Sequence, residues 1–359
     1  MKIPKLRHLG QVWTSGWRGS SLHPVIGIDI GSQAITFAKI QNRQSRLRLD
    51  GWGCRKFDTP ILERGRIRNQ SVLIEGLRAL VEEYGIRGAY VAMAVNGASV
   101  MVKRVHVPQC DRKNLDEFLI WEGPRYIPYD PDDVYLDFAL SPSVSPNSSK
   151  EGLDLLLVVS KREAVDERRT LLEEVGLNPL ICDLDALAFY NLASIHRDVQ
   201  SHRAYILVYL QPTIMHVVVV ACGEPLLIRD VDFLIDMKLG DQPGKSDVLD
   251  QKPKPDDPPE FSSENSSMWE ELLGMEVLGE LKRTLDGARE IQPDLKVEAV
   301  FFSSSLRIRD AFQNELSQGL MIPVFRIDAL ESLRQNRGLS SEGSFLNIAC
   351  GLALRSPYH

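Results

Sequence analysis

Apolar residues occur in short alternating or continuous runs through the first hundred positions, as they do in β-strands. Residues 25–40 contain two such runs on either side of Gly31, and a third run follows near residues 47–52. Residues 71–84 instead carry apolar side chains at helical spacing, and residues 89–95 return to a continuous apolar run. The pattern predicts a β-meander of three strands, followed by a helix and a fourth strand.

A second unit is predicted to begin near residue 100. Its predicted elements, in order, are a strand at 100–107, a helix at 111–126, strands at 134–140 and 153–160, and a helix from Arg162 to Gly176. Glycine is a typical residue at the end of a helix. The order of elements predicts a small β-α-β-β-α module over residues 100–180.

The second half of the chain opens as the first half does. The predicted elements are a helix at 186–195, strands at 205–210, 215–222 and 225–231, a helix near 278–288, a strand at 297–302 and a last helix at 346–354. A second meander after the first suggests an internal duplication. After the second meander, residues 241–267 hold five prolines, seven acids and few apolar side chains, and this composition predicts a disordered insertion.

Composition narrows the function classes. With 359 residues, the chain is too long for one compact domain, and its 43% of hydrophobic residues is enough to form large buried cores. The formal net charge of −7 would repel phosphate backbones, so we expect no nucleic-acid partner. The five cysteines are dispersed without a CxxC pair, which excludes a typical zinc site and favours a reducing compartment.

The N-terminal residues 1–23 form a basic tail without the apolar core of a secretory signal, and the longest apolar stretch is interrupted by Gln211 and Pro212. We therefore expect a cytoplasmic protein. Within the tail, Leu and Trp side chains recur at three- and four-residue spacing among lysines and arginines. Two alternatives remain open: residues 1–18 make peripheral contact with a membrane, or they form a frayed basic terminus.

Three stretches resemble the PilM family, which comprises actin-like pilus assembly proteins related to the division protein FtsA. They are Gly-Ile-Asp-Ile-Gly-Ser at 27–32, Trp-Glu-Gly-Pro-Arg-Tyr-Ile-Pro-Tyr at 121–129 with Asp137 following, and Gly-Leu-Ala-Leu-Arg at 351–355. The first is common to many folds, whereas the second and third are more specific.

The resemblance implies an α/β, actin-like (RNase H-like) fold of two lobes with an inserted FtsA/PilM-type β-α-β-β-α subdomain. The implied division is a tail at 1–23, the first lobe at 24–99 and 181–200, the inserted subdomain at 100–180, the second lobe at 201–340 with its insertion at 241–267, and a C-terminal helix at 341–359 that returns to the first lobe.

The resemblance also implies a site for ATP and Mg²⁺ at the first hairpin, where Asp29, Gly31, Ser32 and Gln33 would face the phosphates and Asp29 would hold water around the metal. A tight turn whose glycine serves only backbone geometry is the alternative. The second phosphate hairpin, residues 208–213, lacks the Asp and Gly of nucleotide-binding relatives, and Ser304-Ser305 replaces the Gly-Gly adenosine turn. We therefore expect a weakened or vestigial nucleotide site, that is, a pseudo-ATPase.

Two further positions have two interpretations each. Glu280 and Arg283 match the nucleotide-side helix of the family, but at i,i+3 spacing they also fit a surface ion pair. Asp185 lies where actin-like enzymes orient a water molecule, but Asp183 and Asp185 also fit as caps of a helix that starts at Ala186.

The resemblance implies a groove beside the inserted subdomain that captures the cytoplasmic N-terminal peptide of PilN, an inner-membrane protein. Tyr126, Ile127, Pro128 and Tyr129 offer aromatic and apolar surface for such a peptide. Alternatively, the first two pack against the end of their own helix. The resulting hypothesis is a scaffold at the inner membrane that contacts PilN and the pilus motor ATPase. The alternatives are an actin-like subunit of a type II secretion system and an ATP-hydrolysing member of the fold.

Overall fold

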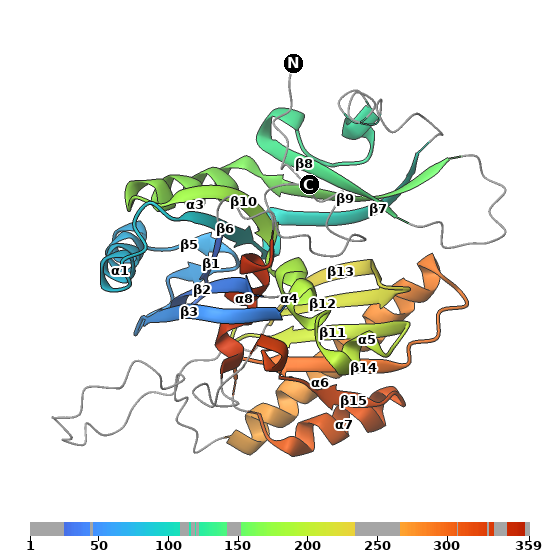
Figure 1. Ribbon diagram of the computed structural model, residues 1–359. Helices are drawn as coiled ribbons and strands as arrows, with labels where there is room; N and C mark the ends of the chain where they lie inside the picture. The colour runs from blue at the N-terminus through green and yellow to red at the C-terminus, as the bar shows by residue number, and fades with distance from the viewer. Residues whose placement is uncertain are drawn as a thin grey trace.

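The computed structural model describes residues 25–43, 46–107, 115, 119, 122–141, 152–233, 266–306, 308–328, 330–333 and 343–355 (Figure 1). The basic tail, nearly all of the predicted disordered insertion and most of the predicted helix at 111–126 lie outside these residues. None of the helices in the described ranges combines the length and the apolar character needed to cross a membrane.

The first lobe is built on a five-stranded sheet with the order β10-β6-β1-β2-β3. Its strands are β1 (Ile26–Ile30), β2 (Ala34–Arg43), β3 (Arg46–Lys56), β6 (Tyr90–Val95) and β10 (Asn178–Leu184). Strands β1, β2 and β3 form the predicted antiparallel meander, and β6 and β10 add to β1 in parallel. The helices of this lobe are α1 (Gln70–Glu83) and α3 (Arg162–Glu174), and a small β4–β5 hairpin (Leu62–Glu63, Arg66–Ile67) lies between β3 and α1.

The second lobe repeats this topology with the order β13-β12-β11-β14-β15. Its strands are β11 (Ala204–Leu210), β12 (Ile214–Ala221), β13 (Glu224–Asp232), β14 (Ala299–Ser304) and β15 (Val324–Arg326), and its helices are α6 (Ser266–Ile291) and α7 (Asp310–Leu320). The same strand order and the same sequence of antiparallel and parallel pairs occur in both lobes. This agreement gives structural support to the internal duplication that the repeated meander suggested.

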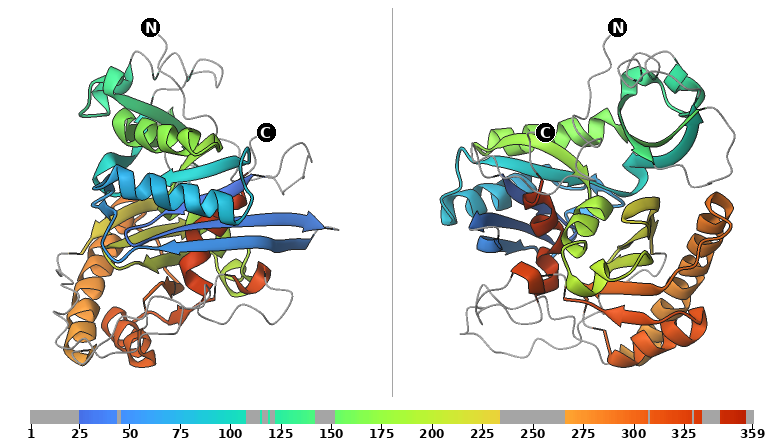
Figure 2. Two further views of the ribbon diagram at one scale, coloured as in Figure 1. Left: turned by 90° about the vertical axis from the view of Figure 1, so that its left-hand side faces the viewer. Right: turned by 45° about the vertical axis from the view of Figure 1, so that its right-hand side comes forward.

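The inserted module contains the antiparallel strands β7 (Val100–Val107), β8 (Val134–Ser141) and β9 (Leu153–Lys161), in the order β7-β9-β8. It projects from one end of the molecule (Figure 2) and has a hydrophobic core of its own. Helix α3 follows β9 but packs on the first lobe, where Leu171 and Leu172 join the main core. Gly176, at φ +83°, ends this segment in a conformation that favours glycine.

Strand β10 was missed by the sequence analysis, which placed the return to the first lobe at residue 181. The chain instead returns with α3 and β10, which pairs in parallel with β6. Pro179 interrupts β10, and only its last two residues, Asp183 and Leu184, are buried, which gives a weak strand pattern typical of an edge. Its position depends on the β6 edge, which local sequence does not reveal.

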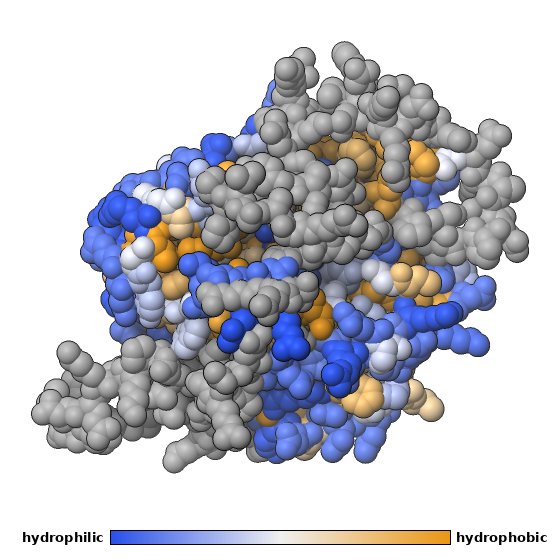
Figure 3. All heavy atoms as spheres, in the orientation of Figure 1, coloured by the Kyte–Doolittle hydropathy of each residue, from blue (hydrophilic) through white to orange (hydrophobic). Residues whose placement is uncertain are grey.

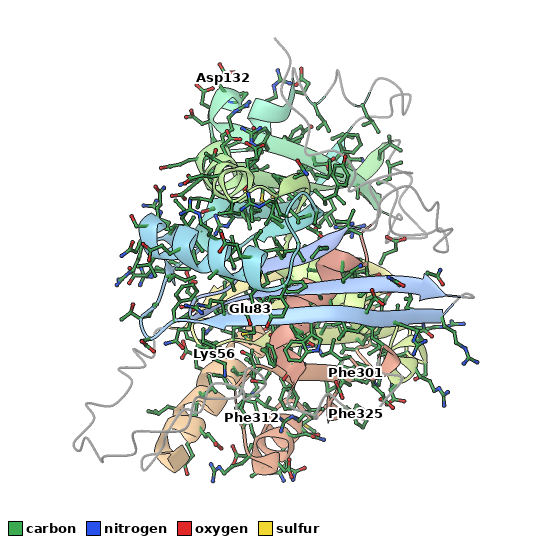
Figure 4. The ribbon with its side chains drawn as sticks, turned by 60° about the vertical axis from the view of Figure 1, so that its left-hand side comes forward. Lys56, Glu83, Asp132, Phe301, Phe312 and Phe325 are labelled. Carbon is green, nitrogen blue, oxygen red and sulfur yellow. The ribbon has the colours of Figure 1, made fainter. Side chains whose placement is uncertain are left out.

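Helices α4 (Asp185–Ala193), followed by the short α5 (Arg197–Gln200), and α8 (Asn347–Ala353) lie between the two sheets (Figure 1). One face of the second sheet, including Leu207, Tyr209 and Phe301, belongs to the same hydrophobic cluster as the first-lobe core. The other face packs on α6 and α7 through side chains such as Phe312. Figure 4 shows Phe301 and Phe312 within the second lobe. The two lobes therefore share a continuous apolar core.

Candidate functional site

The first hairpin, between β1 and β2, is bonded into its own lobe. The Gly31 N–H donates to the Ala34 carbonyl at 2.9 Å, and the Ser32 hydroxyl donates to the carbonyl of Leu62 at 3.2 Å. Asp29, near the end of β1, is only 6% exposed. The predicted residues Asp29, Gly31, Ser32 and Gln33 thus lie together, but the serine hydroxyl is directed to the protein backbone.

The second lobe presents a histidine–carboxylate pair to the first lobe. His216 of β12 is directly opposite Asp230 of β13, and its Nδ1 lies 2.7 Å from the Asp230 Oδ1. The second Asp230 oxygen accepts a hydrogen bond of 2.9 Å from the backbone N–H of Gly97, which follows β6. Asp230 therefore joins the second lobe to the first.

Asp185, the first residue of α4, extends this contact. Its Oδ2 accepts a hydrogen bond from Asn96 and lies 3.8 Å from the Nε2 of His216. Asn96 Oδ1 is buried without a hydrogen-bond partner among the described residues. We call Asp29, Asn96, Asp185, His216 and Asp230 the interlobe cluster.

The sequence interpretation of Asp183 and Asp185 as helix caps is wrong. Helix α4 begins at Asp185 itself, and no side chain bonds to its first amides from the cap position. Asp185 instead faces Asn96 and His216, and Asp183 forms a buried ion pair with Arg355.

Burial and mutual charges raise the pKa values of three members of the interlobe cluster. Burial, and then the charge of Asp185, raises the pKa of Asp29 well above its ordinary value. Burial also raises the pKa of Asp185 to about 6. Burial alone would lower the pKa of His216, but Asp230, Asp185 and Asp29 outweigh it and raise that pKa. His216, Asp29 and Asp185 therefore all keep their protons to a higher pH than they would in water.

A buried arginine supplies further positive charge. Arg168 of α3 is 2% exposed and donates to the carbonyls of Ala164 and Gly65 at 2.9 and 2.7 Å. Burial lowers the pKa of Arg168 from its ordinary value. The positive charge of Arg168 offsets a part of the rise in the pKa values of Asp29 and Asp185. The guanidinium of Arg168 therefore donates to backbone carbonyl groups, and its bond to Gly65 holds the β4–β5 turn in place.

The second hairpin and the serine turn are also bonded internally. The Gln211 N–H donates to the carbonyl of Ile214 at 2.9 Å. The Ser305 N–H donates to the carbonyl of Leu210 at 3.0 Å, and the Ser304 hydroxyl lies 3.4 Å from the same carbonyl. These bonds hold the end of β11 against the end of β14.

Glu280 and Arg283 form an ion pair, which was one of the two roles that the sequence suggested for them. Both lie on α6, and Glu280 accepts a hydrogen bond from Arg283. A second arginine, Arg229 of β13, lies 3.3 Å from Glu280 and donates to Thr284 at 3.1 Å. Glu280 therefore joins α6 to β13, and a nucleotide role for these two residues stays a prediction.

Magnesium–ATP does not fit these groups. Burial raises the pKa of Asp29, so a cation held near it would have to offset the cost of ionising a buried carboxyl group. The second hairpin offers Gln211 in place of a carboxylate. The bond from Gly97 to Asp230 joins the two lobes directly. No group of three or more His, Cys, Asp or Glu side chains in the described part of the chain is arranged to hold a metal ion.

The predicted peptide surface lies on the inserted module. Ile127 is 6% exposed and packs in the core of the module, whereas Tyr126 and Tyr129 are half-buried against that core and Pro128 is exposed. Asp132, also on this module, lies at its far end (Figure 4). Ile127 thus has the packing role that was the alternative interpretation, and the other three side chains offer the accessible surface.

Comparison with known proteins assigns the family. A family model described as type IV pilus assembly protein PilM matches residues 27–234. The chain belongs to the PilM family.

The solved structure of a PilM–PilN type IV pilus biogenesis complex is similar, with a TM-score of 0.69, 19% identity, and coverage of 92% of this chain and 98% of that chain. The fold is therefore the two-lobed actin-like fold of the PilM family. Two structures are more distant. The ethanolamine utilization protein EutJ from Carboxydothermus hydrogenoformans has a TM-score of 0.44 at 11% identity, over 92% of this chain and 89% of its own. The cytoplasmic domain of EpsL, an inner-membrane component of the type II secretion system of Vibrio cholerae, has a TM-score of 0.42 at 12% identity. The match covers 83% of this chain and 94% of that chain.

The PilM-like motifs at both ends of the chain bring backbones together in this structure. A Cβ atom on Gly27 would lie 1.9 Å from the Ala349 carbonyl oxygen, and one on Gly351 would lie 1.8 Å from that of Ala188. Only glycine allows β1 to approach α8 and α8 to approach α4 this closely. Arg355, from the same terminal motif, forms the buried ion pair with Asp183.

Sequence reasoning about this PilM-family chain missed His216, Asn96, Asp230 and Arg168. The available signal was a polar residue inside an apolar run, as His216 is in β12. A buried polar residue requires a partner, but the identity of that partner depends on strand register and lobe packing.

Proposed function

We propose that this chain is a cytoplasmic actin-like scaffold of the type IV pilus assembly platform at the inner membrane. In this role it binds the cytoplasmic N-terminal peptide of a PilN-like protein. The observation that carries the proposal is the family match over residues 27–234, which includes the first-lobe sheet and the whole inserted module. The similar solved structure is a complex of PilM with PilN.

The interlobe cluster supports a scaffold without ATP hydrolysis. Catalysis of phosphoryl transfer needs positioned phosphates, a metal ion and an ionised base. Here His216, Asp230 and Gly97 join the lobes through direct contacts, and burial favours the neutral form of Asp29. A protein whose lobes are already joined presents a fixed surface to its partners, which lowers the entropy cost of binding.

The peptide surface consists of Tyr126, Pro128 and Tyr129 around the buried Ile127. Half-buried aromatic rings lose little side-chain entropy on binding, and a proline fixes the backbone beside them. Tyr129 is additionally held by Lys161, whose Nζ lies 6.0 Å from the ring centroid. This combination of anchored rings and an exposed proline suits an apolar peptide.

The test is calorimetric titration of the full chain with a synthetic peptide corresponding to the cytoplasmic N-terminus of the PilN-like protein from the same genome. Tyr126→Ala and Pro128→Ala should each weaken binding about tenfold, or about 1.4 kcal/mol. Pro131→Ala, in the neighbouring turn, is the matched control and should bind as the wild type does. Ile127 is left unchanged because its removal would disturb the module core. Absence of binding to the wild type, or equal affinity for all variants, would refute the proposal.

A further inference from the structure

A cavity of about 580 Å³ opens on the first lobe, away from the interlobe cluster and the inserted module. Ile26 of β1 and Phe37 of β2 line it from the sheet, Trp52 from β3, and Tyr84 to Tyr90 from the turn after α1. Its volume lies within the range of ligand pockets, roughly 300–1,000 Å³. Figure 3 shows hydrophobic side chains gathered on this side of the first lobe, beside α1.

Gly51 leaves the β3 side of the cavity open. An added Cβ atom at Gly51 would find no atom within 4 Å. Gly53, the next residue on the same face, is instead packed against Phe37 and Tyr84. The space beside residue 51 is therefore open, and a side chain there would begin in the cavity rather than in contact with a neighbour.

An irregularity in strand register brings basic residues to the cavity face. Gly51 is opposite Lys39, but after the bulge Arg48 is opposite Gln41. Residues directly opposite each other in a sheet share a face, so Gly51, Arg48 and Arg46 all lie on the face of Lys39 and Gln41. Without the bulge, Arg48 and Gly51 would lie on opposite faces.

These arginines are available to a partner. Arg46 is exposed, Arg48 is half-buried, and neither forms an ion pair with another described residue. The nearby acid, Asp50, is 3.4 Å from Lys39 and accepts a hydrogen bond of 2.6 Å from Gln41. A local basic surface on a chain with a formal net charge of −7 favours a partner with acidic groups.

We propose that this face binds an extended acidic peptide of a partner protein, with one bulky apolar side chain in the cavity and carboxylates on Arg46 and Arg48. Along a strand, residues are spaced by roughly 3.4 Å. An extended ligand that follows β3 therefore places acids about three and five residues from its apolar anchor.

Two other occupants fit the observations less well. The chain's own segment before β1 contains Lys2, Lys5, Arg7 and Arg18 and no acid. It therefore carries the same positive charge as Arg46 and Arg48 and would be repelled by them. An anionic membrane would use the same charges, but a lipid surface is best met by protruding apolar side chains, and this face offers a hollow. This site is separate from the surface proposed for the PilN-like peptide, and the two proposals fail independently.

The experiment is selection of ten-residue peptides from a phage-displayed random library against the full chain, followed by fluorescence anisotropy with the selected peptides. The expected ligands carry a bulky apolar residue and acids at about the stated spacing. Gly51→Leu fills the cavity and should weaken their binding at least tenfold with an unchanged melting temperature. Arg46→Glu combined with Arg48→Glu should do the same.

Arg197→Glu combined with Arg203→Glu makes the same change in net charge on other exposed positions and is the control, which should bind as the wild type does. The proposal is overturned if no peptide is enriched, or if Gly51→Leu binds the selected peptides unchanged. It is also overturned in favour of a membrane if vesicles of phosphatidylglycerol bind the wild type and Gly51→Leu equally but not the glutamate pair.

Discussion

Gly351→Ala tests the close contact between α4 and α8 that underlies the joined lobes. The added Cβ atom would lie 1.8 Å from the Ala188 carbonyl oxygen and 2.4 Å from its carbon, where ordinary contacts begin near 3.4 Å. Both neighbours are backbone atoms, so the helices must move apart. Overpacking costs about 1–3 kcal/mol, and two backbones in contact place this case near the upper value.

Gly274→Ala is the matched control, because it makes the same chemical change inside α6. There the nearest atom, Glu315 Oε2, would be 3.6 Å from the new Cβ atom, an ordinary contact. Alanine is favoured over glycine inside helices by about 1 kcal/mol. We therefore expect opposite signs for the two variants.

The assay is thermal unfolding by differential scanning calorimetry. An unfolding entropy of about 2.1 cal/mol/K per residue gives a chain of 359 residues a shift of about 1.3 °C for each kcal/mol. Gly351→Ala should therefore lower the midpoint by roughly 4 °C, and Gly274→Ala should raise it by roughly 1 °C. A Gly351→Ala protein as stable as the wild type, or an equal loss in both variants, would refute the packing argument.

Two further predictions concern buried charges. The pKa of Asp185 in the folded protein is raised from 3.8 to about 6, so the contribution of this group to stability is fully present below about pH 4 and is lost as the pH rises through about 6. Asp185→Asn should remove this pH-dependent loss of stability, which is measured as the midpoint of urea unfolding at each pH. Equal slopes of the midpoint against pH for the variant and the wild type would contradict the prediction. Arg355→Met leaves Asp183 buried and unpaired and should cost about 3–5 kcal/mol in urea unfolding. Adding Asp183→Asn should restore part of that loss, whereas strict additivity of the two changes would show that they do not interact.

Much of the fold was predictable because its local patterns are strong. The meanders follow from runs of apolar residues and α1 follows from apolar residues at helical spacing. Helix α8 was also expected, and α3 ends as expected near Gly176, with the glycine at positive φ. Strand β10 was not predictable, because its sequence alternates weakly and its place is decided by the edge of β6. Local propensity is a weak guide where tertiary pairing selects the conformation.

The sequence singled out Asp29 and Asp185 in the candidate site, but not the residues that surround them. Asp29 follows from the hairpin motif of the first lobe, but its neighbours come from β12, β13 and α4, which are far away in sequence. For Asp185 the sequence left two interpretations, a water-orienting residue and a helix cap, because an acid before a helix often acts locally. Its true partners, Asn96 and His216, are set by the packing of the two lobes.

The most direct test of the central claim is calorimetric titration of the full chain with ATP and Mg²⁺, beside Asp29→Ala and with PilN-like peptide as the positive control. If the lobes are joined by the interlobe cluster and the protein is a scaffold, nucleotide binding should be undetectable at about 10 μM, or about −7 kcal/mol, in a sample that binds the peptide. Binding of ATP at or below that concentration that requires Mg²⁺ and is lost in Asp29→Ala would contradict the account and would make the first hairpin part of a working nucleotide site.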